Sequence, residues 1–153
     1  MKTISRTLLL AEDNEDDAFL TARAMESAGI SHNIHHCRDG QAVIEYLEDA
    51  LSRRGKTEEI LLPDLILLDL KMPRLGGLGV LEWIRRHEIL KPLVVLALTS
   101  SSEERDVNAA YQLQINAYLV KPASLSEMID LAHAIRSFWL EQKHLVVPRI
   151  GFS

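Results

Sequence analysis

The sequence predicts a doubly wound α/β domain, with one five-stranded parallel sheet and five helices. Short apolar runs alternate with segments of helical period along the whole chain, as expected of strands covered on both faces. The 153 residues are enough for one domain, and a composition of 47% hydrophobic and 25% charged residues is ordinary for a globular protein. Together these observations favour parallel strands joined by right-handed crossovers.

Five strand candidates share a short length and flanking turn residues. Four of them are almost uniformly apolar, which indicates burial on both faces of the sheet. The second candidate is more polar, which favours a place at or near the sheet edge. In chain order they are Thr7–Ala11, Asn33–Cys37, Asp64–Leu70, Leu93–Leu98 and Ala117–Val120.

Five amphipathic helices complete the repeating pattern. The first is expected over about Asp16–Ala28, with Asn14 near its N-cap and Gly29 as its stop. The last begins after Ser124, an N-cap residue with Glu127 three positions later, and runs to about residue 142. The three between them are expected at about Gly40–Arg54, Gly79–His87 and Glu103–Leu113.

Composition also limits the partners and the compartment. The formal net charge of −5 argues against a nucleic-acid binder, which usually carries a basic face. No apolar run approaches the ~18 residues of a membrane span, and the three leucines near the start are too few for a secretory signal. The single cysteine, Cys37, excludes an internal disulfide framework and favours a reducing, cytoplasmic location.

Polar side chains follow the carboxyl ends of four predicted strands. Glu12 and Asp13 come after the first strand, and Asp69 ends the third. Three carboxylates at one edge repel one another unless a cation binds or their pKa values rise, and Mg²⁺ suits few carboxylates plus phosphate oxygens. Thr99 and Lys121, at the ends of the fourth and fifth strands, would supply a hydrogen bond and a charge to an anion held there.

Each of these residues has an ordinary structural explanation when it is taken alone. The acids after the first strand could be helix N-terminal charge, and Asp69 could be a turn residue. Thr99 could cap the next helix, and Lys121–Pro122 could be a solvated turn. Their occurrence together at four strand ends of one sheet favours a common site.

These motifs resemble the receiver domain of response regulators in bacterial two-component signalling, which has a flavodoxin-like fold. The resemblance extends from about Arg6 to Trp139 and makes 6–142 the expected receiver domain. It is carried by Glu12-Asp13, Asp69-Leu70-Lys71-Met72-Pro73, Thr99-Ser100 and Lys121-Pro122, with Tyr118 three residues before the lysine.

The resemblance implies a phosphoryl-transfer site. Asp69 would accept a phosphoryl group from a phosphohistidine of a sensor histidine kinase, and Thr99 and Lys121 would contact the phosphoryl oxygens. The implied Mg²⁺ ligands are Glu12, Asp13, Asp69 and the backbone carbonyl of Lys71. Output would come from phosphorylation-dependent protein contacts, so the chain is expected to be a switch and not an enzyme, apart from its own autophosphorylation and autodephosphorylation.

Three finer expectations concern individual residues. By resemblance to similar receivers, Tyr118 would turn into the space that Thr99 vacates and change the surface of the fourth helix, fifth strand and fifth helix. The alternative is an ordinary strand aromatic with its hydroxyl in water. The resemblance to receiver domains also implies a cis Lys121–Pro122 peptide. The Lys71 side chain is expected to lie over the path of a water that attacks the phosphoaspartate.

Two segments resemble those of the stand-alone regulators of bacterial phytochromes. One is the long connection Leu51–Leu62, and the other is the apolar arm 143–153. A bacteriophytochrome is therefore the candidate kinase. Because an exposed apolar arm is unfavourable in water, a homodimer is expected through this arm and the fourth helix, fifth strand and fifth helix. The alternative is an arm that folds back on its own domain.

Other classes fit the sequence less well. A magnesium-dependent phosphatase of the haloacid dehalogenase type needs a second aspartate two residues after the nucleophile, where this chain has Lys71. A P-loop motif does not occur. A zinc site built from His32, His35, His36 and Cys37 is disfavoured. Strand alternation places His35 and Cys37 on one face and His36 on the other, so one site gathers at most two good ligands. A receiver that serves only as a scaffold is disfavoured because all the expected site residues are present.

Overall fold

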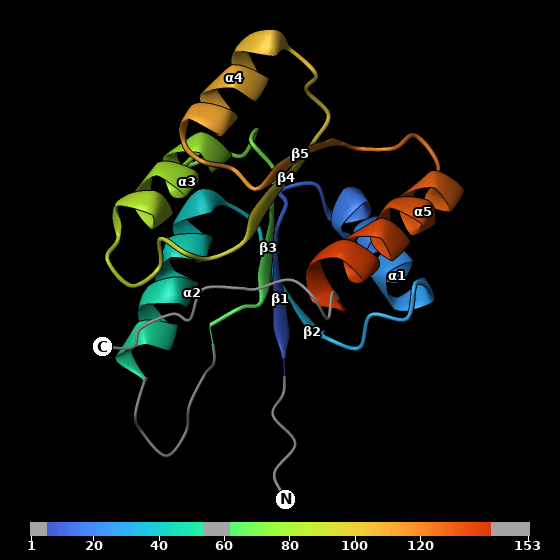
Figure 1. Cartoon of the computed structure of the whole chain (residues 1–153), viewed down its shortest axis with the longest axis horizontal. Coiled ribbons are helices and arrows are strands. Elements are labelled where there is room, and N and C mark those ends of the chain that lie inside the picture. Colours follow the sequence, from blue (N-terminus) through green and yellow to red (C-terminus); the bar gives the residue numbers. More distant parts are fainter. Residues whose placement is uncertain (1–5, 54–61, 142–153) are drawn as a thin grey trace, which may run out of the picture.

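The computed structural model describes residues 6–53 and 62–141. Within these ranges five parallel strands form one sheet, and helices pack on both of its faces (Figure 1). The predicted fold class is therefore confirmed. The arm 143–153 and most of the connection Leu51–Leu62 lie outside the described residues.

All strands are parallel, and their order across the sheet is β2-β1-β3-β4-β5. The edge strand β2 alternates between exposed and partly buried residues, as its polar sequence indicated, and ends in the buried Cys37. The central strands are almost entirely buried, which explains their uniform apolar composition. The bounds are Thr7–Ala11 for β1, Asn33–Cys37 for β2, Leu65–Leu68 for β3, Val95–Thr99 for β4 and Ala117–Val120 for β5.

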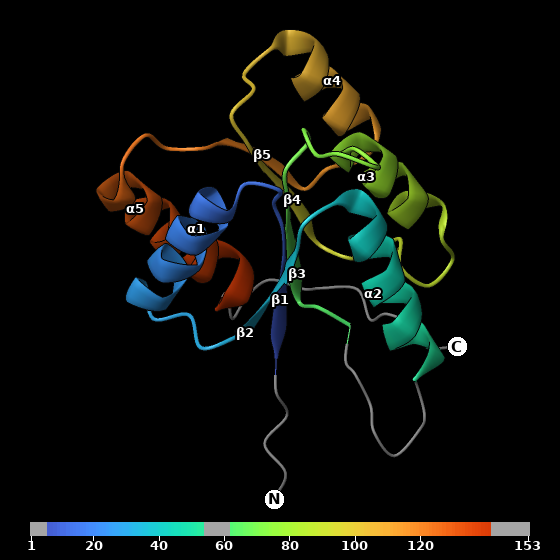
Figure 2. The ribbon, with the colours of Figure 1, turned by 180° about the vertical axis from the view of Figure 1, so that it is seen from behind.

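Helices α1 and α5 cover one face of the sheet, and α2, α3 and α4 cover the other (Figures 1 and 2). The last helix passes into a π-helical turn, η1, within the segment predicted as one helix. The bounds are Glu15–Ser27 for α1, Gly40–Ser52 for α2, Gly77–Arg86 for α3, Glu104–Gln112 for α4, Leu125–Ile135 for α5 and Arg136–Leu140 for η1.

Local signals set the ends of these helices. The Asn14 side chain accepts a hydrogen bond from the Asp17 amide at 3.0 Å, and Ser124 accepts one from the Glu127 amide at 3.1 Å, so both predicted N-caps are confirmed. Helix α3 begins two residues earlier than predicted. Its first residue, Gly77, lies so close to the Asp69 carbonyl that a Cβ atom would clash with it.

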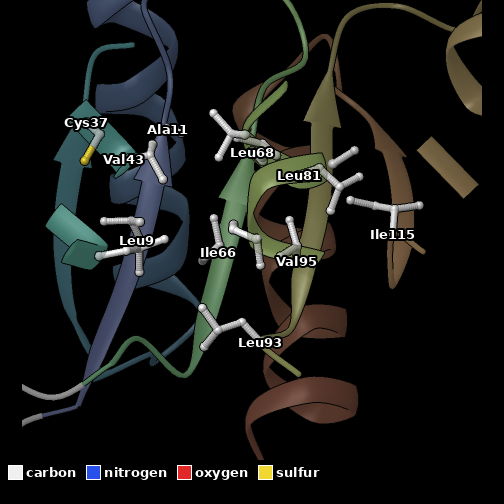
Figure 3. Packing of buried hydrophobic residues seen from close by; sticks show 14 of the residues in the cluster. Leu9, Ala11, Cys37, Val43, Ile66, Leu68, Leu81, Leu93, Val95 and Ile115 are labelled. Atoms are coloured by element: carbon white, nitrogen blue, oxygen red, sulfur yellow. The ribbon is translucent and has the colours of Figure 1, made fainter. Parts of the chain in front are cut away.

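Two apolar layers hold the sheet from either side. Alternate residues of each strand point to opposite faces, so Leu9 and Ile66 pack toward α2 and α3 while Leu8 and Leu67 pack toward α1 and α5. Figure 3 shows the first layer, in which β1, β3 and β4 contribute adjacent side chains. Because burying each leucine contributes roughly 1.5–3 kcal/mol, this core fixes the strand ends firmly.

Within residues 6–53 and 62–141, no helix combines the length and apolar character required to cross a membrane.

Candidate functional site

The carboxyl ends of β1 and β3 form the switch point of the sheet. These strands are neighbours, but β2 lies beyond β1 and β4 lies beyond β3, so the chain winds in opposite directions from them. Glu12, Asp13 and Asp69 meet here, with one carboxylate oxygen of each within 4.8 Å of the others. Glu12 and Asp69 are buried, whereas Asp13 is exposed. The predicted cluster of three carboxylates is thus present, and it is open to solvent on one side.

Backbone and side-chain hydrogen bonds fix the first of these acids. The Glu12 amide donates to the Cys37 carbonyl at 2.9 Å, and Glu12 Oε2 accepts from the Asn14 amide at 3.1 Å. The ring Nε2 of His36 donates to the Glu12 carbonyl at 2.6 Å. This role of His36 was not predicted, because a strand histidine 24 residues away carries no sequence signal for it.

Lys121 is the cation among these carboxylates. Its ammonium forms ion pairs with Glu12, with Asp69 at 3.0 Å and with Asp17 at 3.0 Å, and its side chain is only 13% exposed. Asp17 was not predicted to take part; it belongs to the first turn of α1, where acids are common without a site. The structure therefore confirms that the fifth strand delivers a lysine to this cluster.

Burial and ion pairing act in opposite directions on the pKa values of Glu12 and Lys121. Burial raises the pKa of Glu12 to about 7, although its hydrogen bond with Lys121 opposes the rise. Burial also disfavours the charged form of Lys121, but hydrogen bonds to Glu12, Asp17 and Asp69 outweigh it and hold the Lys121 pKa above its ordinary value. Lys121 is therefore charged at neutral pH while Glu12 is only partly ionised.

We expect the metal-free protein to lose stability as the pH rises from about 5 to about 7.5. The folded pKa of Glu12 lies above its ordinary value of 4.5, so the folded state binds more protons over this interval and the stability present below pH 4.5 is lost as Glu12 ionises. The free energy of unfolding should fall by about 1–3 kcal/mol in chelator-treated samples. Denaturant melts at stepped pH test this, with Glu12→Gln as the control that should remove the slope.

The buried hydroxyl of Thr99 is available to form a hydrogen bond. Thr99 is fully buried at the end of β4, and its Oγ1 has no hydrogen-bond partner among the described residues. The Lys121 amide donates to the Thr99 carbonyl at 2.8 Å, which places the two residues at the same edge. A buried hydroxyl without a partner is costly, so this group is suited to an anion that arrives at the cluster.

Tyr118 and Lys71 make contacts on the α4 side of the site. The Tyr118 hydroxyl donates to the Ser101 carbonyl at 2.8 Å, so the hydroxyl is bonded to the protein, contrary to the alternative of a hydroxyl in water. The Lys71 ammonium lies 3.4 Å from Asp106 Oδ2. The carboxylate of Asp106 thus attracts this ammonium toward α4, and the expected position of Lys71 over the water path of a phosphorylated Asp69 stays a prediction.

One other expectation fails. The Lys121–Pro122 peptide is trans, like every peptide bond of the described residues. The trans form is favoured by ~0.5–1 kcal/mol before proline, and the lysine reaches the carboxylates from it.

The zinc alternative finds no support among residues 6–53 and 62–141. The one cluster there of three or more potential metal-ligating side chains is Glu12, Asp13 and Asp69. His35 packs on Tyr46 with 4.4 Å between ring centroids, and burial raises the pKa of the Cys37 thiol to about 12, which disfavours the thiolate that zinc would need.

Comparisons with known proteins agree with this geometry. Residues 8–133 match the family model described as "Response regulator receiver domain". Response regulator Rcp1 of Synechocystis sp. is 37% identical over 136 residues, which cover 89% of this chain and 90% of that protein. Its solved Mn²⁺-bound form shares a TM-score of 0.76 at 34% identity, over 94% of this chain and 99% of that one.

A second solved structure is similar over almost the full length. It is the phosphorylated cyanobacterial phytochrome response regulator RcpA, with a TM-score of 0.81 and 32% identity. The alignment covers 95% of this chain and 100% of RcpA.

Proposed function

Because the chain belongs to the response regulator receiver family, we propose that it accepts a phosphoryl group on Asp69 from a sensor histidine kinase. The observation that carries this proposal is the convergence of three carboxylates, the buried Lys121 ammonium and the unpartnered Thr99 hydroxyl at one edge of the sheet. Nothing in this set favours the phosphatase alternative, since the position two residues after Asp69 is Lys71.

The donor set suits a divalent cation with oxygen ligands, and we propose Mg²⁺. The carboxylates of Glu12, Asp13 and Asp69 and the main-chain carbonyl of Lys71 would hold it. When bound, it neutralises negative charge on the incoming phosphoryl group. Burial is the main reason that the pKa of Glu12 is raised, and the neighbouring charge of Asp69, which a bound cation would offset, adds to the rise.

Three side chains have separate roles in the transfer of the phosphoryl group. A carboxylate oxygen of Asp69 attacks phosphorus, and the bond from phosphorus to the donor breaks with its electron pair on the donor. Lys121, already 3.0 Å from Asp69 Oδ2, stabilises the charge of the transferred oxygens. Thr99 donates its free hydroxyl hydrogen to one of them.

Incubation with acetyl phosphate tests this function. Intact-mass measurement should show a gain of one phosphoryl group with Mg²⁺ present and no gain after chelation with EDTA. A chain that never gains this mass under either condition contradicts the proposal.

Replacing the exposed acid of the cluster should weaken metal binding without unfolding the chain. Asp13→Asn removes one charged ligand, so we expect Mg²⁺ affinity to fall by about tenfold or more, measured by calorimetry. Asp16→Asn is the matched control, because Asp16 is also exposed but lies outside the cluster. Equal affinities for the two variants would contradict the proposed ligand set.

We propose that phosphorylation is passed on through the surface of α4, β5 and α5. Movement of Thr99 toward the phosphoryl group would allow Tyr118 to turn inward, which breaks its hydrogen bond to Ser101 and changes that surface. The similarity to RcpA supports a bacteriophytochrome as the kinase, and the single buried cysteine, Cys37, supports a cytoplasmic location. The role is that of a phosphoacceptor switch, with only its own phosphorylation and dephosphorylation as chemistry.

We also propose a homodimer formed through that surface and the apolar arm 143–153. The exposed side chains of Tyr111, Val120 and Phe138, from α4, β5 and η1, are apolar surface available for such an interface. A chain ended after Gln142 should sediment as a monomer at concentrations where the full chain is a dimer. A truncated chain that remains dimeric would show that the arm is not required for dimer formation.

A further inference from the structure

Asp106 is a nearly buried carboxylate outside the phosphoryl site. It lies in the first turn of α4 and is only 7% exposed. Its Oδ2 accepts a hydrogen bond from the Ser101 hydroxyl at 2.5 Å and lies 3.4 Å from the Lys71 ammonium. The hydrogen bond from Ser101 is the main cause that lowers the pKa of Asp106, and the Lys71 ammonium lowers it further. The carboxylate is therefore ionised at neutral pH.

These contacts join the phosphoryl site to the surface proposed for output. Lys71 is two residues after Asp69, and its amide donates to Asp69 Oδ1 at 3.0 Å. At the other end, Ser101 accepts the hydroxyl of Tyr118 on its carbonyl. Asp106 is therefore the one described residue bonded to both the Lys71 side chain and the loop that binds Tyr118.

We propose that Asp106 is a positioning residue that holds the Lys71 ammonium away from the phosphoryl group and so shortens the life of the phosphoaspartate. This inference rests on the proposed phosphorylation of Asp69. The Lys71 side chain is 57% exposed and has room to move, so its direction depends on which anion attracts it. Once Asp69 carries a phosphoryl group, Asp106 and the phosphoryl oxygens compete for the same ammonium.

The affected step is hydrolysis of the phosphoaspartate. A water oxygen attacks phosphorus in line, the bond from phosphorus to the Asp69 oxygen breaks, and its electron pair stays on the carboxylate. The water proton leaves with the phosphate product or the solvent. A Lys71 side chain drawn over the phosphoryl group obstructs this approach, whereas one held by Asp106 leaves it open.

Decay rates of the phosphorylated protein test the proposal. Each chain is phosphorylated with acetyl phosphate and Mg²⁺, freed of donor, and followed by intact mass. Asp106→Asn keeps the size of the side chain and its bond with Ser101 but weakens the hold on Lys71, so decay should slow by about two- to fivefold. Glu104→Gln, an exposed acid in the same turn of α4, should decay at the wild-type rate.

A double variant separates this role from a general effect on α4. Lys71→Ala should speed decay more in the Asp106→Asn background than in the wild-type background. Equal effects in both backgrounds, or a wild-type rate in Asp106→Asn, would overturn the proposal. Lys71→Ala alone offers a test that does not depend on how the Asp106 variant folds. Because Asp106 already holds the Lys71 ammonium away from the phosphoryl group in the wild-type chain, this variant should change the decay rate by less than about twofold, and a larger acceleration would also overturn the proposal.

If the wild-type chain never gains a phosphoryl group, it is the proposed function that fails. If the wild-type chain is phosphorylated but the Asp106 and Lys71 variants lose the phosphoryl group at the wild-type rate, only the proposed role of Asp106 fails.

Discussion

Lys121→Met should destabilise the metal-free protein by about 3 kcal/mol at pH 7.5, because it leaves the buried carboxylates of Glu12 and Asp69 without their cation. The loss should shrink below pH 7, where Glu12 is protonated. Added Mg²⁺ should restore part of the stability by taking over the role of the ammonium. Denaturant unfolding at pH 6.0 and pH 7.5, with and without Mg²⁺, measures these effects.

The same substitution should slow phosphorylation by acetyl phosphate by about a hundredfold, the usual effect of removing one donor that stabilises transition-state charge. Lys91→Met is the matched control, since Lys91 is a half-exposed lysine whose only described ion pair is with Glu88. Its loss should change stability by less than about 0.5 kcal/mol. A wild-type free energy of unfolding and a wild-type phosphorylation rate in Lys121→Met would show that the ion pairs of Lys121 determine neither the stability nor the reactivity of the cluster.

Asp69→Asn should abolish phosphorylation altogether. The amide lacks the anionic oxygen that would attack phosphorus, and no other described carboxylate is buried at the end of β3. The fold should persist, because the substitution removes one of three crowded carboxylates as well as one partner of Lys121, and these effects oppose each other. We expect a free energy of unfolding within about 1 kcal/mol of wild type.

Intact mass after treatment with acetyl phosphate and Mg²⁺ measures this loss, and circular dichroism confirms folding. Asp64→Asn serves as the control: Asp64 precedes the amino end of β3, at the opposite end of the strand from the cluster. A full phosphoryl gain in folded Asp69→Asn would mean that another group accepts the phosphate.

The edge where the site forms could be predicted from the sequence because of a simple geometric rule. Parallel strands end at the same edge of a sheet, so the residues after each apolar run had to meet. This rule was enough to predict that Glu12, Asp13 and Asp69 lie together with Lys121, which is 52 residues beyond Asp69 in the chain. The helix caps at Asn14 and Ser124 were predictable for a related reason, since they depend only on neighbouring residues.

The contacts around the site could not be predicted in the same way. Asp17 reaches Lys121 across 104 residues, and Asp106 pairs with Lys71 only because α4 packs beside the loop after β3. In the sequence, each is one acid among several in a first helical turn, where acids commonly serve only the helix dipole. Which of them binds a lysine depends on how the helices are placed against the sheet, and the hydrophobic pattern leaves that open.

The central claim is that the phosphoryl group resides on the Asp69 carboxylate, and site mapping tests it most directly. Borohydride reduces an acyl phosphate of aspartate to homoserine, so the chain would be phosphorylated with acetyl phosphate and Mg²⁺, reduced, digested and sequenced by mass spectrometry. We predict homoserine at position 69 alone, and none when Mg²⁺ is chelated. Homoserine at Asp13 or Asp17 with Asp69 intact, or phosphate retained on His36, would contradict the claim.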